Sequence, residues 1–192
     1  VYVGTTKKDN CTAIGGGGNG YGHVTINGGV ITAISNSTGT AIGGGIGYSS
    51  NGGNAYIKIT GGKVYAYNTG QSYTKYFVPG VAIGGGSSYS NTGNSSTTIS
   101  ITGGEVNAES IGGVAIGGGS SAQKSGGPAT ITIDGNSKVT AKSTASSFTY
   151  SSVTYDIPAG SGIGGGTGGT TGNGGNATVT ILNGQVNSGT IG

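Results

Sequence analysis

The chain has 192 residues, of which 47 are glycine and only 7 % are charged. Eight lysines and five acidic residues give a formal net charge of +3, and the sequence contains no arginine. Nucleic-acid binding depends on clustered basic residues, with arginine for bidentate contacts, so this composition argues against a nucleic-acid partner. Glycine without a strict three-residue period also excludes collagen.

After a strand-like start at Val1-Tyr2-Val3, two motifs alternate along the chain. The glycine motif reads Ala-Ile-Gly-Gly-Gly in four of its five copies, which begin at Ala13, Ala41, Ala82, Ala115 and Gly162. The strand motif, of the form ITGGEVNA, follows each of them, with copies that begin at Val24, Ile57, Ile99, Ile131 and Val179. A unit repeated in tandem indicates a stack of similar turns rather than an ordinary globular core.

In each copy of the strand motif, apolar and polar residues alternate on both sides of a glycine-containing turn. This pattern predicts strand, turn and strand. Aligning the copies yields four inward columns of β-branched residues. The columns are Val24, Ile57, Ile99, Ile131 and Val179; Ile26, Ile59, Ile101, Ile133 and Ile181; Ile31, Val64, Val106, Val139 and Val186; and Ile14, Ile42, Ile83, Ile116 and Ile163.

Such columns are what a parallel β-solenoid requires, because each turn lies on the previous one at about 4.8 Å. We therefore expect an all-β fold, a single-stranded parallel β-helix (β-solenoid) with almost no helix. The right-handed coil is the expectation, although the sequence leaves the hand open. It would form one domain over residues 1–192, with about five turns that begin near residues 12, 40, 81, 114 and 161.

The glycine motif predicts a corner of the coil, where positive φ or a close approach of stacked chains demands glycine. A phosphate-binding loop is the functional alternative. That loop requires a following helix and usually a Lys-Ser or Lys-Thr pair, and neither follows Gly15–Gly17 or its equivalents. We therefore expect no nucleotide cofactor.

The segments that precede each glycine motif alternate in length: 34–40 and 109–114 are short, whereas 67–81 and 142–161 are long. The two long segments concentrate aromatic residues, and loops on a rigid scaffold commonly carry binding sites. The candidate ligand-binding residues are Tyr67, Tyr73, Tyr76, Phe77, Tyr150 and Tyr155. The alternative interpretation is that the inserts fold back and cover apolar surface of the solenoid.

The same alignment yields outward columns. One reads Thr25, Lys58, Ser100, Thr132 and Thr180, and another reads Thr32, Tyr65, Asn107, Thr140 and Asn187. Flat threonine ladders can order water and bind ice, but Lys58, Tyr65 and Asn107 interrupt the regularity. Threonine is also favoured on ordinary solvated sheets, so these columns predict a solvated face.

The chain contains few of the residues that catalysis and metal binding require. The acids are Asp9, Glu105, Glu109, Asp134 and Asp156, and no column of acids repeats down the stack. Glu105 is expected to point outward from a strand, and Glu109 to open a loop. His23 is the only histidine, so the chain offers few candidate residues for a histidine-based metal site or a catalytic triad. We expect no enzyme activity, no catalytic residues and no metal site.

The single cysteine, Cys11, cannot form an intrachain disulfide, and no apolar run reaches the length of a membrane helix. Membrane insertion is therefore not expected, and no signal peptide is recognised. Scarcity of cysteine suits a bacterial outer surface, which favours an extracellular or cell-surface location. A small buried residue in an intracellular protein is the alternative interpretation of Cys11.

The alternation of the two motifs over Ala13–Ser188 resembles Gly-rich parallel β-helix repeats of bacterial secreted or cell-surface proteins, especially those of Firmicutes. Gly162 in place of Ala, the extra residue at Asn136-Ser137, and Asn183 with Ser188 depart from the pattern. The resemblance implies a surface, adhesin-like or carbohydrate-binding role, with no binding residue transferable position by position.

Two functions follow as hypotheses. The first is a non-catalytic extracellular module that displays aromatic loops for adhesion or for binding a glycan, a host surface or the cell wall. The second is a structural protomer that stacks head to tail into a filament or stalk, because the ends of the predicted stack lack the polar caps that solenoids normally carry.

Overall fold

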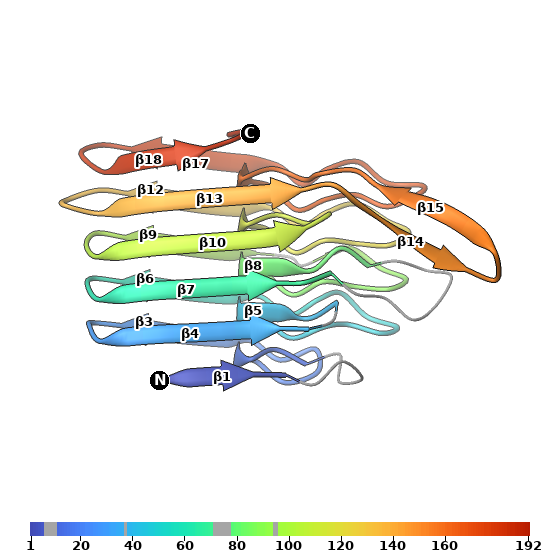
Figure 1. Cartoon of the computed structure of the whole chain (residues 1–192), viewed down its shortest axis with the longest axis horizontal. Helices are drawn as coiled ribbons and strands as arrows, with labels where there is room; N and C mark the ends of the chain where they lie inside the picture. Colours follow the sequence, from blue (N-terminus) through green and yellow to red (C-terminus); the bar gives the residue numbers. More distant parts are fainter. Residues whose placement is uncertain (6–10, 37, 71–77, 94–95) are drawn as a thin grey trace.

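A computed structural model of the chain describes residues 1–192 except 6–10, 37, 71–77 and 94–95. The described chain is all-β without helix. It has three parallel sheets, in which each strand pairs with its equivalents in the neighbouring turns, three strands away in the chain, or five where a separate two-stranded antiparallel sheet intervenes. The predicted parallel β-helix is confirmed, with about five to six turns. Figure 1 shows the turns stacked from the N-terminus at one end to the C-terminus at the other.

The sheets are named here in order of their first strand. Sheet A contains β1 (Tyr2–Gly4), β4 (Val30–Ser35), β7 (Lys63–Asn68), β10 (Glu105–Ile111), β13 (Lys138–Thr144) and β18 (Gln185–Ser188). Sheet B contains β2 (Ile14–Gly15), β5 (Thr40–Gly43), β8 (Val81–Gly84), β11 (Ile116–Gly117) and β16 (Ile163–Gly164). Sheet C contains β3 (Gly22–Ile26), β6 (Ala55–Ile59), β9 (Thr97–Ile101), β12 (Ala129–Ile133) and β17 (Ala177–Ile181).

All four predicted apolar columns stack in the expected register. Ile57 pairs with Val24 on one side and with Ile99 on the other, and the same holds for the other columns. Burial alternates along the strands, so that the β6 residues at odd numbers are buried and those at even numbers are exposed. The core is therefore a set of Ile, Val and Ala ladders inside the coil, as period-two alternation dictates.

The glycine motif forms the predicted corner. Gly15, Gly43 and Gly84 have φ of 138°, 144° and 153°, which side chains of L-residues rarely adopt. The next glycine of the motif continues the ladder, because the backbone N–H of Gly44 donates to the carbonyl of Gly84 at 2.9 Å. Both reasons expected for glycine, positive φ and close approach, therefore operate at this corner.

Some residues expected in loops lie in strands, because β4 and β10 extend further than the apolar alternation indicates. Glu109, expected to open a loop, is an exposed residue of β10. The extension carries an inward column of polar residues, Ser35, Asn68, Ser110 and Ser143. Ser110 Oγ donates to the carbonyl of Gly80 at 3.0 Å, and Ser143 Oγ donates to that of Gly113 at 2.6 Å. This column therefore ties the strands of sheet A to the chain that returns to sheet B.

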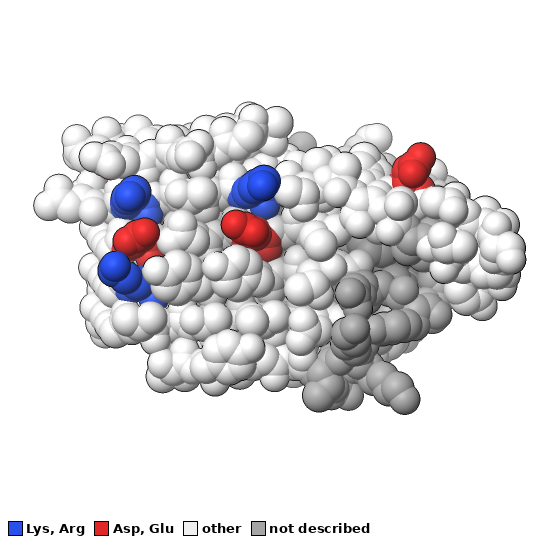
Figure 2. All heavy atoms as spheres, in the orientation of Figure 1, with Lys and Arg blue, Asp and Glu red and all other residues white. Residues whose placement is uncertain are grey.

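The outer face of sheet A carries five of the nine charged residues that the structure describes. Lys63, Glu105 and Lys138 are register neighbours, and the Lys63 ammonium lies 3.8 Å from the Glu105 carboxylate. Glu109 and Lys142 form a second neighbouring pair in the same sheet. Figure 2 shows these acids and lysines alternating over the strands. Exposed pairs of this kind contribute little stability, and their alternation avoids like charges on adjacent strands.

Candidate functional site

The segment 142–161, expected as a long loop, contains an antiparallel hairpin of β14 (Ser146–Tyr150) and β15 (Val153–Ile157). The hairpin projects beyond the stack in Figure 1. Tyr150 pairs with Val153, and Ser146 pairs with Ile157, so these residues share one face of the ribbon with Tyr155. Ile157 is buried near the root, whereas Tyr150, Val153 and Tyr155 are 41 %, 51 % and 39 % exposed.

The hairpin turn consists of Ser151 and Ser152, with φ of 48° and 64°. Positive φ at both central residues is the requirement of a type I′ turn, whose twist matches that of the flanking strands. Across the opposite face of the ribbon, the hydroxyls of Thr149 and Thr154 lie 3.1 Å apart. The turn and the antiparallel strand pairing hold the two tyrosines on a defined ribbon rather than on an irregular loop.

The hairpin is anchored to the stack by the polar column. The backbone N–H of Gly160 donates to Ser143 Oγ at 2.8 Å, which links the chain that leaves β13 to the chain that returns after β15. The strand β10 lies between β7 and β13 in sheet A. The roots of the two long inserts are thus two strand spacings apart, about 10 Å, as expected.

Of the remaining predicted residues, the structure describes only Tyr67. Tyr67 is a half-buried outward residue of β7, with Ile34 and Glu109 as register neighbours. Burial raises the pKa of the Tyr67 phenol, and the negative charge of Glu109 raises it further. Tyr73, Tyr76 and Phe77 lie outside the described residues. Among the predicted tyrosines that the structure describes, the hairpin therefore brings Tyr150 and Tyr155 together, whereas Tyr67 lies on sheet A.

A second surface, which the sequence analysis missed, is the outer face of sheet C. Three outward columns can be followed from the strand pairing: Tyr21, Asn54, Ser96, Pro128 and Asn176; His23, Tyr56, Thr98, Thr130 and Thr178; and Thr25, Lys58, Ser100, Thr132 and Thr180. Only the third of these columns was predicted from the sequence. The other two columns follow from the same period-two alternation. They lie two and four residues before the third column in the sequence of each turn.

Aromatic rings gather at the N-terminal end of this face. The His23 ring lies edge-on to Tyr56, with centroids 5.0 Å apart, and to Tyr21 at 6.2 Å. Tyr21 and Tyr56 are 58 % and 38 % exposed. On the neighbouring loops, Tyr48 and Tyr89 stack with centroids 5.4 Å apart and an interplanar angle of 15°. The rings pack on one another, and Tyr21, Tyr48 and Tyr56 remain exposed.

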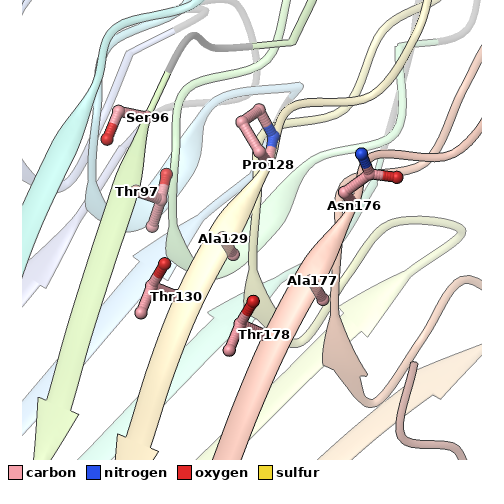
Figure 3. Close-up of a pocket in the computed structure, with 8 residues that line it drawn as sticks. All are labelled: Ser96, Thr97, Pro128, Ala129, Thr130, Asn176, Ala177 and Thr178. Carbon is pink, nitrogen blue, oxygen red and sulfur yellow. The ribbon is translucent and has the colours of Figure 1, made fainter.

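Two shallow hollows lie along the first column. One, of about 400 Å³, is bordered by Asn19, Tyr21, Ser50, Asn51 and Asn54, together with two glycines. The other, of about 140 Å³, is bordered by side chains of β9, β12 and β17 and of the residues that precede them. Figure 3 shows its lining of Ser96, Thr97, Pro128, Ala129, Thr130, Asn176, Ala177 and Thr178, with hydroxyls and the amide at the surface.

The described part of the chain lacks both clustered metal ligands and long apolar helices. No group of three or more His, Cys, Asp or Glu residues there could hold a metal ion. Within the same residues, no helix has the length and apolar character needed to cross a membrane. Comparisons with models of protein families, with curated proteins and with solved structures found no match to this chain.

Proposed function

We propose that this chain is a non-catalytic extracellular module of a bacterial surface protein, which displays aromatic side chains on its inserts for adhesion or glycan binding. The observation that carries the proposal is the exposed face of the β14–β15 hairpin, with Tyr150, Val153 and Tyr155 on one side. A tyrosine ring packs on the apolar C–H face of a sugar while its hydroxyl still forms hydrogen bonds. The alternative role of the insert, covering apolar surface, would not require these side chains to be exposed.

The test is a glycan array probed with the wild-type chain and with the double variant Tyr150→Ala/Tyr155→Ala. Loss of about 1.4 kcal/mol corresponds to a tenfold loss of affinity, so removing two contact rings is expected to weaken binding at least tenfold. Thr149→Val/Thr154→Val is the matched control, because it changes the opposite face of the same ribbon and keeps β-branched side chains. Glycan binding that is equal in wild type and in the tyrosine variant would refute the assignment to this hairpin.

The other insert is tested separately with Tyr73→Ala/Tyr76→Ala. If the two inserts form one site, either double variant is expected to abolish binding, with the β-signal in circular dichroism retained. Binding that survives both double variants would place the site elsewhere on the molecule. Failure of the wild-type chain to bind any glycan would refute the proposed function itself.

A structural role is the second candidate, and the exposed edges of the stack favour it. Tyr2 lies in the edge strand β1 and is 72 % exposed, and at the opposite end Leu182 is 62 % exposed beside the edge strand β17. Open edges of parallel sheets are templates for further strand pairing, so a second copy could continue the stack head to tail.

Sedimentation velocity over a wide concentration range tests this candidate. Growing species that disappear in Ile181→Lys, which places a charge on an edge strand of the last turn, would support stacking. A monomer at every concentration would refute it. The control variant Thr149→Val/Thr154→Val should sediment like the wild-type chain.

A further inference from the structure

The outer face of sheet C presents three parallel columns of side chains, each with one member from every turn. Each column runs along the stack with a spacing of about 4.8 Å between neighbours. The three columns together contain fifteen residues. Lys58 is the only one of them that is Asp, Glu, Lys or Arg. The remaining side chains are hydroxyls, amides, aromatic rings and one proline. A ligand that fits this face therefore needs polar groups without net charge.

The two ends of the face offer different contacts. Tyr21 and Tyr56, with His23 packed edge-on between them, present exposed rings at the first two turns. At the last three turns the second column continues as Thr98, Thr130 and Thr178, all of which are exposed. Rings that accept C–H groups and hydroxyls that donate and accept hydrogen bonds are the two kinds of contact that a sugar residue makes.

The two hollows on this face are aligned with the axis of the stack. One is bordered by Tyr21 and Asn54, and the other by Ser96, Pro128 and Asn176, so that all five residues of the first column border one hollow or the other. The Asn54 side chain joins two turns, because its Oδ1 accepts a hydrogen bond from the backbone N–H of Ser96 at 2.9 Å. Both hollows therefore lie along one line, parallel to the axis of the stack.

We propose that the outer face of sheet C binds an extended, neutral polysaccharide chain that lies along the stack. Sugar rings pack on Tyr21 and Tyr56 at one end, and the hydroxyls of further sugar residues bond to the Ser, Thr and Asn side chains at the other. Five turns span about 20 Å, which is the length of an oligosaccharide rather than of one sugar. The backbone beneath is held in one five-stranded ladder, with β6, β9 and β12 paired on both sides, so binding requires little ordering of the protein.

This face shares a ligand class with the proposed function but uses a different surface, so its test separates the two. Affinity electrophoresis in gels that contain xylan, mannan or a linear β-glucan measures binding of the full chain. Tyr21→Ala/Tyr56→Ala is expected to weaken binding at least tenfold. Thr130→Val/Thr178→Val, which removes two hydroxyls at constant shape, is expected to weaken it by a smaller factor. Tyr65→Ala, on the outer face of sheet A, is the matched aromatic control and should bind like wild type.

The outcomes are distinct. If Tyr150→Ala/Tyr155→Ala abolishes binding while the sheet C variants bind normally, the proposed function stands and this inference is overturned. If the sheet C variants lose binding and the hairpin variant does not, the inference stands and the hairpin site fails. Titration calorimetry with oligosaccharides of two to six units adds a second criterion. Affinity should rise with length, and affinity that is independent of length, or confined to acidic polysaccharides, would overturn an extended neutral site.

Discussion

The glycine corner leads to a prediction that separates its two physical causes. A Cβ at Gly43 would meet both constraints, because φ is +144° and the added carbon would lie 2.9 Å from the carbonyl carbon of Gly84 and closer still to its oxygen. A Cβ at Gly44 would meet only the close approach, to the carbonyl of Gly53, without positive φ. Gly29 has φ of +84° and open space, and Gly28 has open space and no such φ. Four Gly→Ala variants therefore form a complete two-by-two set.

The expected magnitudes follow from each cause. Gly28→Ala should stabilise the fold by about 0.4–1 kcal/mol, because it restricts only the unfolded chain. Gly29→Ala should cost about 1–2 kcal/mol for left-handed backbone. Gly44→Ala should cost about 1–3 kcal/mol or more, since backbone must move to admit the methyl group. Gly43→Ala combines both causes and should cost about 2–5 kcal/mol.

Urea denaturation followed by circular dichroism measures these differences, with the slope of the transition as a check that the unfolding unit is unchanged. For a chain of this size, each kcal/mol also lowers the melting temperature by about 2–4 °C. The reasoning is refuted if Gly43→Ala and Gly44→Ala unfold at the same urea concentration as Gly28→Ala. It is refuted in part if Gly29→Ala is as damaging as Gly43→Ala, because the close approach would then contribute nothing.

Two further predictions concern the surface. Ser151→Asn/Ser152→Gly should stabilise the hairpin by about 1 kcal/mol, because Asn-Gly adopts the required positive φ more readily than serine, and slower hydrogen exchange of the hairpin amides would show it. The backbone N–H of Gly135 and, to a smaller degree, the amide of Asn183 hold the pKa of Asp134 below its usual value. Asn183→Ala should therefore raise that pKa part of the way back, as measured by NMR titration. A lowered folded-state pKa contributes stability above the unfolded-state pKa, which is lost as pH falls through the folded-state value, so wild type should lose more stability on acidification than the variant.

The core of this fold could be predicted because its determinants are local and repeated. Ile57, Ile99 and Ile131 stand at the same phase of alternation in each copy, and a shift of one residue would turn all of them outward. Parallel stacking of identical turns then fixes every register at once. The alternation was therefore sufficient to place all four apolar columns in the register that the structure has.

The hairpin could not be predicted with the usual turn signals. Ser151-Ser152 lacks the Asn-Gly or Asp-Gly pair that marks a type I′ turn, although both serines adopt positive φ. The polar inward column was missed for a related reason. Asn68, Ser110 and Ser143 are indistinguishable by composition from loop residues, and their burial depends on carbonyl partners that only the closed coil brings within reach.

In a stack of this kind, the residues that vary from turn to turn distinguish positions needed for the fold from positions available for function. Inward columns must repeat one size and polarity, because each residue packs on its equivalents above and below, so they carry little information beyond the fold. Outward columns are free to change, and the column from His23 changes from rings to hydroxyls halfway along the stack. A solvated face would tolerate any such order. A face that binds an extended neutral chain would instead need its rings clustered and its charges few. Sheet C has this arrangement, with Lys58 as the single charge in its three columns, whereas lysines and acids alternate on sheet A.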